Sequence, residues 1–448
     1  MKPDRPFLVY AIILLVHLLY FFYGVFRPPV SLPDTGDYLN ASHHLFGQGV
    51  FYCGDLSEPV REELFTRRPP LYPILLGIQF LTGSENLVYL FQIILSMVSI
   101  MVVFRIFAPE SRDQKPLFHV AALVLILATP AQFIYSSRIM AEIPFQLLIV
   151  LSVWSLFKHL KTQEQKYIWL FHLFLTLGMA TKPVLYPFAA VSLVFSLYMF
   201  LVTRKRVWIL ALCLPLIWIG GYRYWNYQRT GSTQYSSIQT ANLINYNLRY
   251  FITSREGPAV AATEVDMLYD RCAETDSYRE KNLCLEWGAR EIIRTRMSEY
   301  VLFHLKGSVR YFIDPGRFDL VTFFRTGETE GPGFLDTVHK RGIRGAFGFL
   351  GQQGPGLILV LVLIGFFKLV KVTGFVYYLF RRQQPLHLRI FLFLLVGYMA
   401  VVTGPLGASR FLLPVELLII GGAVRGWTAI LKPTSPGSGR VHPGQVKG

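Results

Sequence analysis

Apolar stretches of about 20 residues recur along this chain, and they constrain its fold more than any other feature. Each stretch can cross a hydrocarbon core of about 30 Å as a helix, because a helix rises about 1.5 Å per residue. We expect about ten spans, near residues 7–26, 84–107, 117–134, 138–157, 167–181, 184–202, 207–225, 355–380, 387–405 and 409–427. The composition agrees, because 52% of the 448 residues are hydrophobic and 16% are charged. The sequence therefore predicts an all-α polytopic transmembrane protein.

Lysine and arginine gather in alternate loops, which sets the expected orientation. These loops lie near residues 2–5, 105–115, 158–166, 204–206, 381–382 and 432. We expect them to face the cytoplasm from a multi-pass protein of the bacterial inner (plasma) membrane. The topology and contact with anionic membrane lipids explain the formal net charge of +16. We expect no nucleic-acid partner, because no basic stripe or zinc-finger spacing is present.

Two long segments are expected on the opposite, extracytoplasmic side. The first is the loop 28–82, which belongs to an expected N-terminal catalytic module over residues 1–225. The second is a mixed soluble segment, 226–354, in which Cys272 and Cys284 can close a disulfide in an oxidising compartment. Two free thiols on a helix are the alternative. C-terminal spans over 355–431 and a disordered polar tail, 432–448, complete the expected organisation.

The motif PDTGDY opens the first of these loops. Its apolar spacing predicts a short amphipathic helix that begins near Asp34 and lies along the membrane surface. Asp34 is a good N-cap residue, and Asp37 three positions later favours the helix dipole. The local pattern alone favours capping, and it leaves a catalytic role for Asp34 as the alternative.

Arg67 and Arg68 precede a Pro-Pro pair in FTRRPPLYP, where the chain is expected to re-enter the membrane. Guanidinium groups there can bind a phosphate in a bidentate manner. The alternative is contact with lipid headgroups, which is less expected on the outer face than on the inner one.

Three further charged sites lie at the outer ends of predicted spans. Arg138 and Glu142 are one helical turn apart in SSRIMAEIPF, so an i, i+4 ion pair is an alternative to a role in a site. Lys182 precedes a helix-breaking proline in ATKP, and Arg410 has Glu416 about two turns deeper. Charges in spans are costly, so each is a site candidate, and pairing among themselves is the alternative.

Nucleotide-binding and hydrolase motifs are absent from the sequence. No GxxxxGK[ST], GxGxxG, GxSxG or HExxH pattern occurs, no Cys/His spacing suggests zinc, and no cytoplasmic loop is long enough for a nucleotide-sugar. A donor must therefore arrive through the membrane. A lipid-linked phosphate suits arginine and lysine beside carboxylates.

The order of these motifs resembles the GT-C superfamily of membrane glycosyltransferases, in the branch that holds protein O-mannosyltransferases and the lipid A aminoarabinose transferase. The resembling features are PDTGDY, RRPPLYP, SSRIMAEIP, ATKP and SRFLLP. The resemblance implies a GT-C-like fold with outer-face amphipathic helices, Asp34 as catalytic base, and Arg68, with Arg67 beside it and Lys182, at the donor phosphate. Many relatives have Glu where Thr35 follows Asp34, which weakens the case for a protein acceptor.

We therefore expect a hexosyl- or pentosyltransferase that moves a sugar from a polyprenyl phosphate to a lipid, glycan or protein acceptor, with inversion. Asp37, Tyr38, Glu142, Arg138 and Arg410 are the expected acceptor-side or secondary residues. We expect no required cofactor and no metal site, and a divalent cation on Asp37 and Glu142 is the alternative. The competing functions are a lipid-linked-sugar flippase or transporter and a polysaccharide polymerase or ligase.

Overall fold

The structure is a computed structural model that describes residues 5–27, 32–326, 354–381 and 384–431. These residues form helices and no strands, which confirms the predicted all-α class. Seven helical spans in the described part are long and apolar enough to cross a membrane. They are α1 (Arg5–Phe26), α4 (Asn86–Phe107), α7 (Glu142–Thr162), α10 with α11 (Val207–Leu210 and Cys213–Thr230), α19 (Pro355–Phe380), α20 (Leu386–Thr403) and α21 (Ser409–Leu431).

The other three predicted spans are helical but shorter or broken. α5 (Lys115–Leu127) and α6 (Pro130–Ser136) meet at a bend of 67°, where Pro130 cannot donate a helical hydrogen bond. α8 (Lys166–Thr181) and α9 (Phe188–Thr203) have 16 residues each, fewer than the roughly 20 that a full crossing needs. The expectation of about ten spans is therefore corrected to seven in the described residues, or eight if the bent pair is one span.

The spans differ strongly in burial. α21 packs against α4, α5, α7 and α19, and 83% of its apolar window is buried. Glycines allow the closest approach, because a Cβ atom on Gly426 would lie 2.4 Å from the carbonyl oxygen of Gly374 in α19. Only 28% of the window of α1 and 17% of that of α19 is buried, so their outward apolar side chains are expected to contact lipid.

The described part of the loop 28–82 folds against one end of the bundle. It contains α2 (Pro33–Gln48), the 3-10 helices η1 (Glu62–Phe65) and η2 (Gly77–Leu81), and α3 (Leu71–Leu76). The amphipathic helix predicted near Asp34 is therefore present as α2. It ends at Gly49, whose positive φ of 71° suits glycine.

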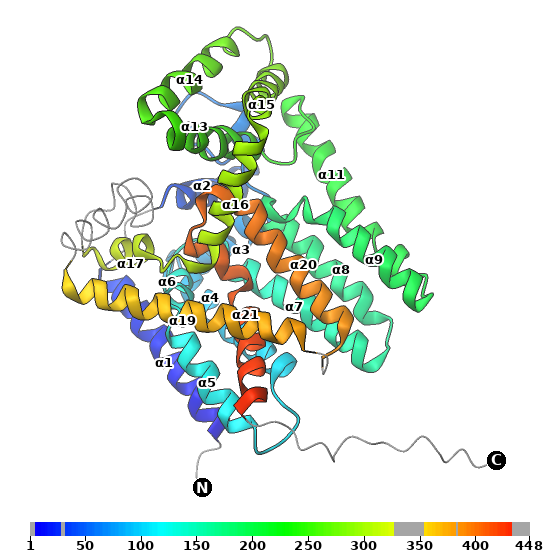
Figure 1. The fold of residues 1–448 in the computed structure, drawn as a ribbon. Helices are drawn as coiled ribbons and strands as arrows, with labels where there is room; N and C mark the ends of the chain where they lie inside the picture. Colours follow the sequence, from blue (N-terminus) through cyan, green and yellow to red (C-terminus); the bar gives the residue numbers. More distant parts are fainter. Residues whose placement is uncertain (1–4, 28–31, 327–353, 382–383, 432–448) are drawn as a thin grey trace.

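Residues 231–326, which we call the inter-span segment, lie between α11 and the later spans. They form α12 (Ile238–Asn242), the π-helix η4 (Leu243–Leu248), α13 (Arg249–Glu256), α14 (Pro258–Arg271), α15 (Tyr278–Arg294), α16 (Met297–Ile313) and α17 (Arg317–Phe324). Figure 1 shows α13, α14 and α15 gathered at one end of the molecule, with α16 running from them toward α20, which it contacts. The expectation of a mixed segment is corrected, because the described part is helical.

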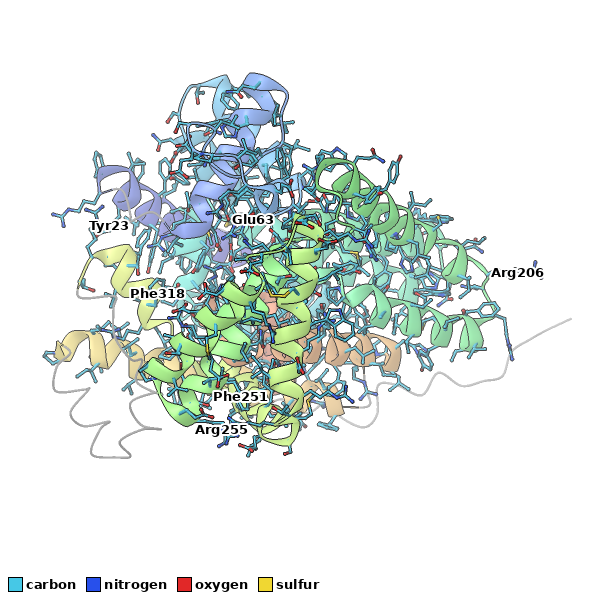
Figure 2. The ribbon with its side chains drawn as sticks, turned by 90° about the horizontal axis from the view of Figure 1, so that it is seen from above. Tyr23, Glu63, Arg206, Phe251, Arg255 and Phe318 are labelled. Atoms are coloured by element: carbon cyan, nitrogen blue, oxygen red, sulfur yellow. A yellow bond between two sulfur atoms is a disulfide. The ribbon has the colours of Figure 1, made fainter. Side chains whose placement is uncertain are left out.

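The inter-span segment has a small apolar core of its own. Val265 and Leu268 of α14 pack there against Leu285 and Ala289 of α15. A disulfide joins Cys272 to Cys284, with 5.8 Å between their Cα atoms. Figure 2 looks down on this end of the molecule, where the helices of the segment, α13 among them, cover much of the bundle.

Candidate active site

Asp34 lies in the first turn of α2, with Asp37 one turn later on the same side of the helix. Pro33 occupies the first helical position, which suits its fixed φ, and Leu32 is the N-cap residue without a side-chain cap bond. Asp34 therefore does not cap the helix, which corrects the interpretation favoured by the local pattern. Both of its carboxylate oxygens instead accept hydrogen bonds from arginines.

Arg67 and Arg68 bring two guanidinium groups to these carboxylates. Arg68 Nη2 lies 2.6 Å from Asp34 Oδ1 and 2.8 Å from Asp37 Oδ2, and Arg67 Nε donates to the same Asp37 oxygen at 2.8 Å. The Arg68 side chain is 5% exposed and lies over the ring of Tyr38, with its Cζ atom 5.0 Å from the ring centre. Tyr38 is itself 1% exposed, so its buried ring packs against the guanidinium of Arg68 in a cation–π contact.

Backbone contacts fix the arginine pair between the membrane helices and the inter-span segment. Tyr222 of α11 donates its hydroxyl hydrogen to the Arg68 carbonyl at 3.2 Å, and Ser236 donates to the Arg67 carbonyl at 2.7 Å. The two prolines that follow Arg68 lead into α3. The guanidinium groups are thus held at the point where the chain turns back into the bundle.

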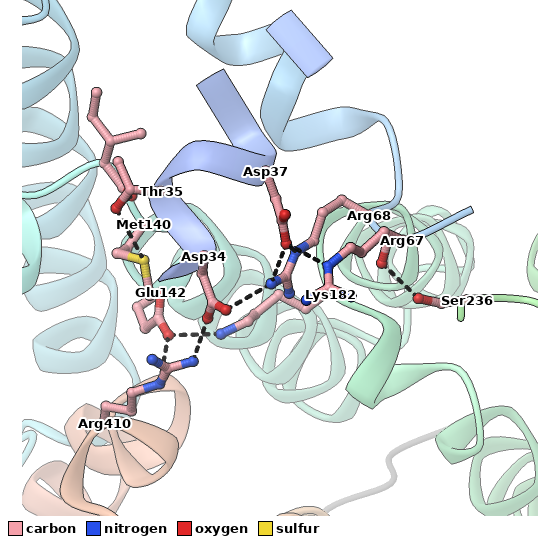
Figure 3. A network of polar contacts seen from close by, with 11 residues as sticks. Asp34, Thr35, Asp37, Arg67, Arg68, Met140, Glu142, Lys182, Ser236 and Arg410 are labelled. Atoms are coloured by element: carbon pink, nitrogen blue, oxygen red, sulfur yellow. Dashed lines mark hydrogen bonds and ion pairs between the residues drawn. The ribbon is translucent and has the colours of Figure 1, made fainter. Parts of the chain in front are cut away.

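Glu142, Lys182 and Arg410 complete the cluster from three different helix ends, as Figure 3 shows. Lys182 Nζ donates to Glu142 Oε1 at 2.7 Å, and Arg410 Nη2 donates to Asp34 Oδ2 at 2.5 Å. Arg410 Nε lies 3.6 Å from Glu142 Oε1. Glu142 begins α7, Lys182 follows the last residue of α8, and Arg410 is the second residue of α21, so residues far apart in sequence meet at one level of the bundle.

We call Asp34, Asp37, Glu142, Arg67, Arg68, Lys182 and Arg410 the ionic cluster. With every member ionised, four cations face three carboxylates, so one positive charge is in excess. Burial alone would raise the pKa of Asp34, but the charges of Arg410 and Arg68 outweigh it and hold that pKa well below its usual value. A partly buried cluster with excess positive charge is suited to bind an anion.

Buried polar contacts fix the N-terminal end of α21, which carries Arg410. Pro414 lies inside this helix and has no N–H to give to the Arg410 carbonyl. Ser409, which comes directly before Arg410, makes two hydrogen bonds. It donates its backbone N–H to Asp314 Oδ2 at 2.6 Å and its hydroxyl hydrogen to Asp319 Oδ2 at 2.5 Å. Asp319 also accepts the hydroxyl hydrogen of Tyr135 at 2.6 Å. The end of the inter-span segment therefore contacts α21 at the residue next to Arg410.

Deeper in the bundle, Glu416 pairs with lysines that the sequence analysis did not single out. Lys371 Nζ lies 2.6 Å from Glu416 Oε1 and donates to Thr129 at 2.7 Å, and Lys368 Nζ lies 4.0 Å from the same Glu416 oxygen. Glu416 therefore belongs to this second group and is not a partner of Arg410. Two lysines in the apolar run GFFKLVKVTGF were the available signal, because charges in spans are costly.

Arg138 is the predicted charged site residue that does not join the ionic cluster. It lies between α6 and α7, with no helical turn connecting it to Glu142, and the alternative of an i, i+4 ion pair is not what the structure shows, because Glu142 pairs with Lys182. The residue is 3% exposed, and its guanidinium lies over the ring of Phe323, with Cζ 5.5 Å from the ring centre.

The carboxylates that were metal candidates already bind basic side chains. Asp37 Oδ2 accepts from Arg67 and Arg68, and Glu142 Oε1 accepts from Lys182. A divalent cation at these oxygens would have to displace those partners. No group of three or more His, Cys, Asp or Glu side chains in the described residues is arranged to hold a metal.

Comparison with known proteins gives a match to a family model and matches to solved structures. Residues 67–223 match the family model of dolichyl-phosphate-mannose-protein mannosyltransferases. This range includes Arg67, Arg68, Arg138, Glu142 and Lys182. No curated protein sequence matches the chain.

Three solved structures are similar to this chain, and two of them have TM-scores above 0.5. The archaeal oligosaccharyltransferase AglB from Archaeoglobus fulgidus, in complex with an inhibitory peptide and a dolichol-phosphate, has a TM-score of 0.52 and 12% identity, over 96% of this chain and 51% of that one. Its apo form has a TM-score of 0.52 and 14% identity over the same shares. ArnT from Cupriavidus metallidurans, bound to undecaprenyl phosphate, has a TM-score of 0.40 and 13% identity, over 94% of this chain and 77% of that one.

The chain thus spans about half the length of the oligosaccharyltransferase structures that it matches. The similarity extends over nearly all of this chain, and at such low identity it shows the fold alone. Together with the sequence match, it confirms the resemblance drawn from the motifs. The chain has the fold seen in the AglB structures, and its residues 67–223 match the family model of dolichyl-phosphate-mannose-protein mannosyltransferases.

Proposed function

We propose that the protein is an integral membrane glycosyltransferase that moves a hexosyl or pentosyl group from a polyprenyl phosphate to a hydroxyl or amine of a lipid, glycan or protein acceptor. The observation that carries this proposal is the carboxylate of Asp34, held between Arg68 and Arg410 in a cluster with excess positive charge. The match to a family that uses a dolichyl-phosphate sugar supports it. So does the fold shared with AglB, whose structure contains a dolichol-phosphate and a peptide.

The chemistry is a single displacement at the anomeric carbon of the donor. The acceptor oxygen or nitrogen forms a bond to that carbon, and its proton passes to a carboxylate oxygen of Asp34. The bond from the carbon to the phosphate oxygen breaks, and its electron pair stays on the departing polyprenyl phosphate. Arg68, Arg67 and Lys182 stabilise the charge that grows there, and the configuration at the anomeric carbon inverts.

Donor binding also makes Asp34 a better base. In the free protein two arginines hold its carboxylate, so it binds a proton weakly. A donor phosphate that binds to Arg68 and Lys182 brings a negative charge close to Asp34 and competes for its partners, which raises the pKa of Asp34. The base is therefore activated only when the leaving group is in place.

The proposed reaction requires no cofactor. Four basic side chains of the ionic cluster can supply the positive charge that a divalent cation supplies elsewhere. Transfer should therefore continue at an undiminished rate in excess EDTA. A rate that falls in EDTA and recovers with added Mg²⁺ or Mn²⁺ would contradict this part of the proposal.

We place the reaction on the extracytoplasmic face, because the lysine-rich and arginine-rich loops lie at the other ends of the spans. Reporter fusions at Gln163, which lies in the loop after α7, and at Thr275 of the inter-span segment test this placement. The cytoplasm-specific reporter should be active at Gln163 and the exterior-specific one at Thr275. The reverse result would move the ionic cluster to the cytoplasmic face.

Proteoliposomes that contain a fluorescent polyprenyl-phosphate sugar separate the proposal from its rivals. A transferase releases polyprenyl phosphate and labels an acceptor, without any nucleotide. A flippase moves the intact donor between leaflets and leaves the sugar–phosphate bond unbroken, so that result would overturn the proposal. A polymerase or ligase transfers a preassembled glycan, so a product that carries a single added sugar excludes it.

A further inference from the structure

The loop between α6 and α7, together with Glu142 at the start of α7, carries polar groups that the mechanism above does not use. Three side chains between Ser137 and Glu142 have buried polar atoms without a hydrogen-bond partner. These atoms are the Ser137 hydroxyl oxygen, all three guanidinium nitrogens of Arg138, and Glu142 Oε2. Buried polar groups in proteins are normally hydrogen-bonded, so such a concentration on six residues is typical of a place that binds a polar ligand.

Arg138 is the most costly of these groups to leave without a partner. A guanidinium does not lose its proton in proteins, so it cannot become neutral when it is buried. The Phe323 ring offsets only part of the desolvation. The negative charge of Asp319 acts on the Arg138 guanidinium, but its two carboxylate oxygens accept hydrogen bonds from the hydroxyls of Tyr135 and Ser409. The guanidinium therefore keeps its full capacity for a bidentate contact with an anion.

This loop lies beside Asp34, on the side away from the arginine pair. The Thr35 hydroxyl donates to the Ile139 carbonyl at 3.2 Å, which fixes the loop against the first turn of α2. Figure 3 shows Thr35 and Met140 on one side of Asp34, and Arg67 and Arg68 on the other. In an inverting displacement the acceptor attacks from the side opposite the leaving group. If the phosphate leaves toward Arg68, the acceptor approaches from the side of the α6–α7 loop.

We propose that the α6–α7 loop is the acceptor subsite, and that the acceptor carries a phosphate or carboxylate group near the hydroxyl or amine that receives the sugar. This inference rests on the proposed function. Arg138 binds the anionic group of the acceptor in a bidentate manner. The Ser137 hydroxyl donates a hydrogen bond to the acceptor, and Glu142 Oε2 accepts a hydrogen bond from the acceptor. The Phe323 ring covers the guanidinium in this structure, so it moves aside when the acceptor binds.

Anion binding to the purified protein tests this subsite without any sugar transfer. The donor site is first saturated with a short-chain prenyl phosphate, and calorimetry then follows titration with methyl phosphate or with acetate. The wild-type protein should bind at least one of these probes, and the probe that binds more tightly identifies the class of anion. Arg138→Met should weaken this binding about 10- to 100-fold, the loss of a charged hydrogen-bonded contact.

The controls separate the subsite from the donor site. Arg138→Met should leave the affinity for prenyl phosphate unchanged, whereas Arg68→Gln should lower that affinity and leave the binding of methyl phosphate or acetate intact. If Arg138→Met does not fold, Arg138→Lys, which keeps the charge but loses the bidentate geometry, should still weaken probe binding. Wild-type probe affinity in the folded Arg138 variant, or no probe binding to the wild-type protein, would overturn the inference.

A failure of the proposed function would look different. In that case prenyl phosphate would not bind and no sugar would be transferred, while Arg138-dependent binding of methyl phosphate or acetate would still be measurable without it.

Discussion

Replacement of Asp34 by Asn removes a proton acceptor and changes little else in shape. The amide oxygen can still accept one hydrogen bond from Arg68 or Arg410, which contact the carboxylate at 2.6 and 2.5 Å. Exchanging two hydrogen bonds to a carboxylate for one hydrogen bond from an arginine to a neutral amide oxygen should cost about 1 to 4 kcal/mol of stability. The excess charge of the cluster rises by one, so the affinity for an anionic donor should stay the same or increase.

Turnover should fall far more than binding. Loss of a general base lowers the rate by about 10² to 10⁴, which corresponds to about 2.7 to 5.4 kcal/mol in the barrier. The assay is transfer from a synthetic polyprenyl-phosphate sugar by purified, folded protein, together with a separate measurement of donor affinity. We expect kcat to fall within this range while donor affinity is maintained.

Asp37→Asn is the matched control, because it makes the same change in charge one turn along α2. Asp37 contacts Arg67 and Arg68 but not Arg410, and the mechanism gives it no proton to accept. Its loss should lower kcat by less than about tenfold, through the position of Arg68. If Asp34→Asn keeps more than about a tenth of wild-type turnover, or if both variants lose the same amount, Asp34 is not the base.

Three further predictions concern pH, the position of Arg410 and the disulfide. Arginines hold the pKa of Asp34 well below its usual value in the free protein, so kcat/KM should not fall through this group on acidification to about pH 5. On acidification, the kcat of the donor complex should begin to fall at a higher pH than kcat/KM does. If kcat/KM falls at the higher pH, the result would contradict activation of Asp34 by the donor. Asp319→Asn weakens the contact that fixes Ser409, so kcat should fall about tenfold with unchanged donor affinity; unchanged kcat in steady-state assays would show that this contact does not position Arg410. Reduction of the Cys272–Cys284 bond, which links residues 12 positions apart, should destabilise the inter-span segment by about 3 kcal/mol; scanning fluorimetry with and without dithiothreitol checks this, and an unchanged Tm would count against the disulfide.

The recurrence of long apolar stretches was sufficient to predict the helical class and the approximate place of each of the seven spans in the described residues. It could not show that α5 and α6 bend by 67° at Pro130, because a proline kink leaves the apolar run intact. The end of α8 at Thr181 does agree with the predicted stretch 167–181, which stops before the helix-breaking Pro183. The bend angle depends on local backbone geometry, which a count of hydrophobic residues does not register.

The members of the ionic cluster could be named from the sequence, but their partners could not. Local spacing favoured Asp34 as a helix cap, whereas its contacts are Arg68 and Arg410, which is 376 positions away. Spacing also suggested an ion pair between Arg138 and Glu142, yet the chain is not helical at Arg138 and Glu142 binds Lys182. Such pairings arise from the packing of distant helices, which local spacing does not encode.

The configuration of the product tests the account most directly. Purified protein is incubated with a synthetic polyprenyl-phosphate sugar of known anomeric configuration and with cell-envelope acceptors, without nucleotide. Mass spectrometry identifies the products, and nuclear magnetic resonance gives the new linkage. We predict release of polyprenyl phosphate and a transferred sugar of inverted configuration, because Asp34 acts as a base and not as a nucleophile. A retained configuration, or a donor that stays intact with every acceptor, would contradict the account.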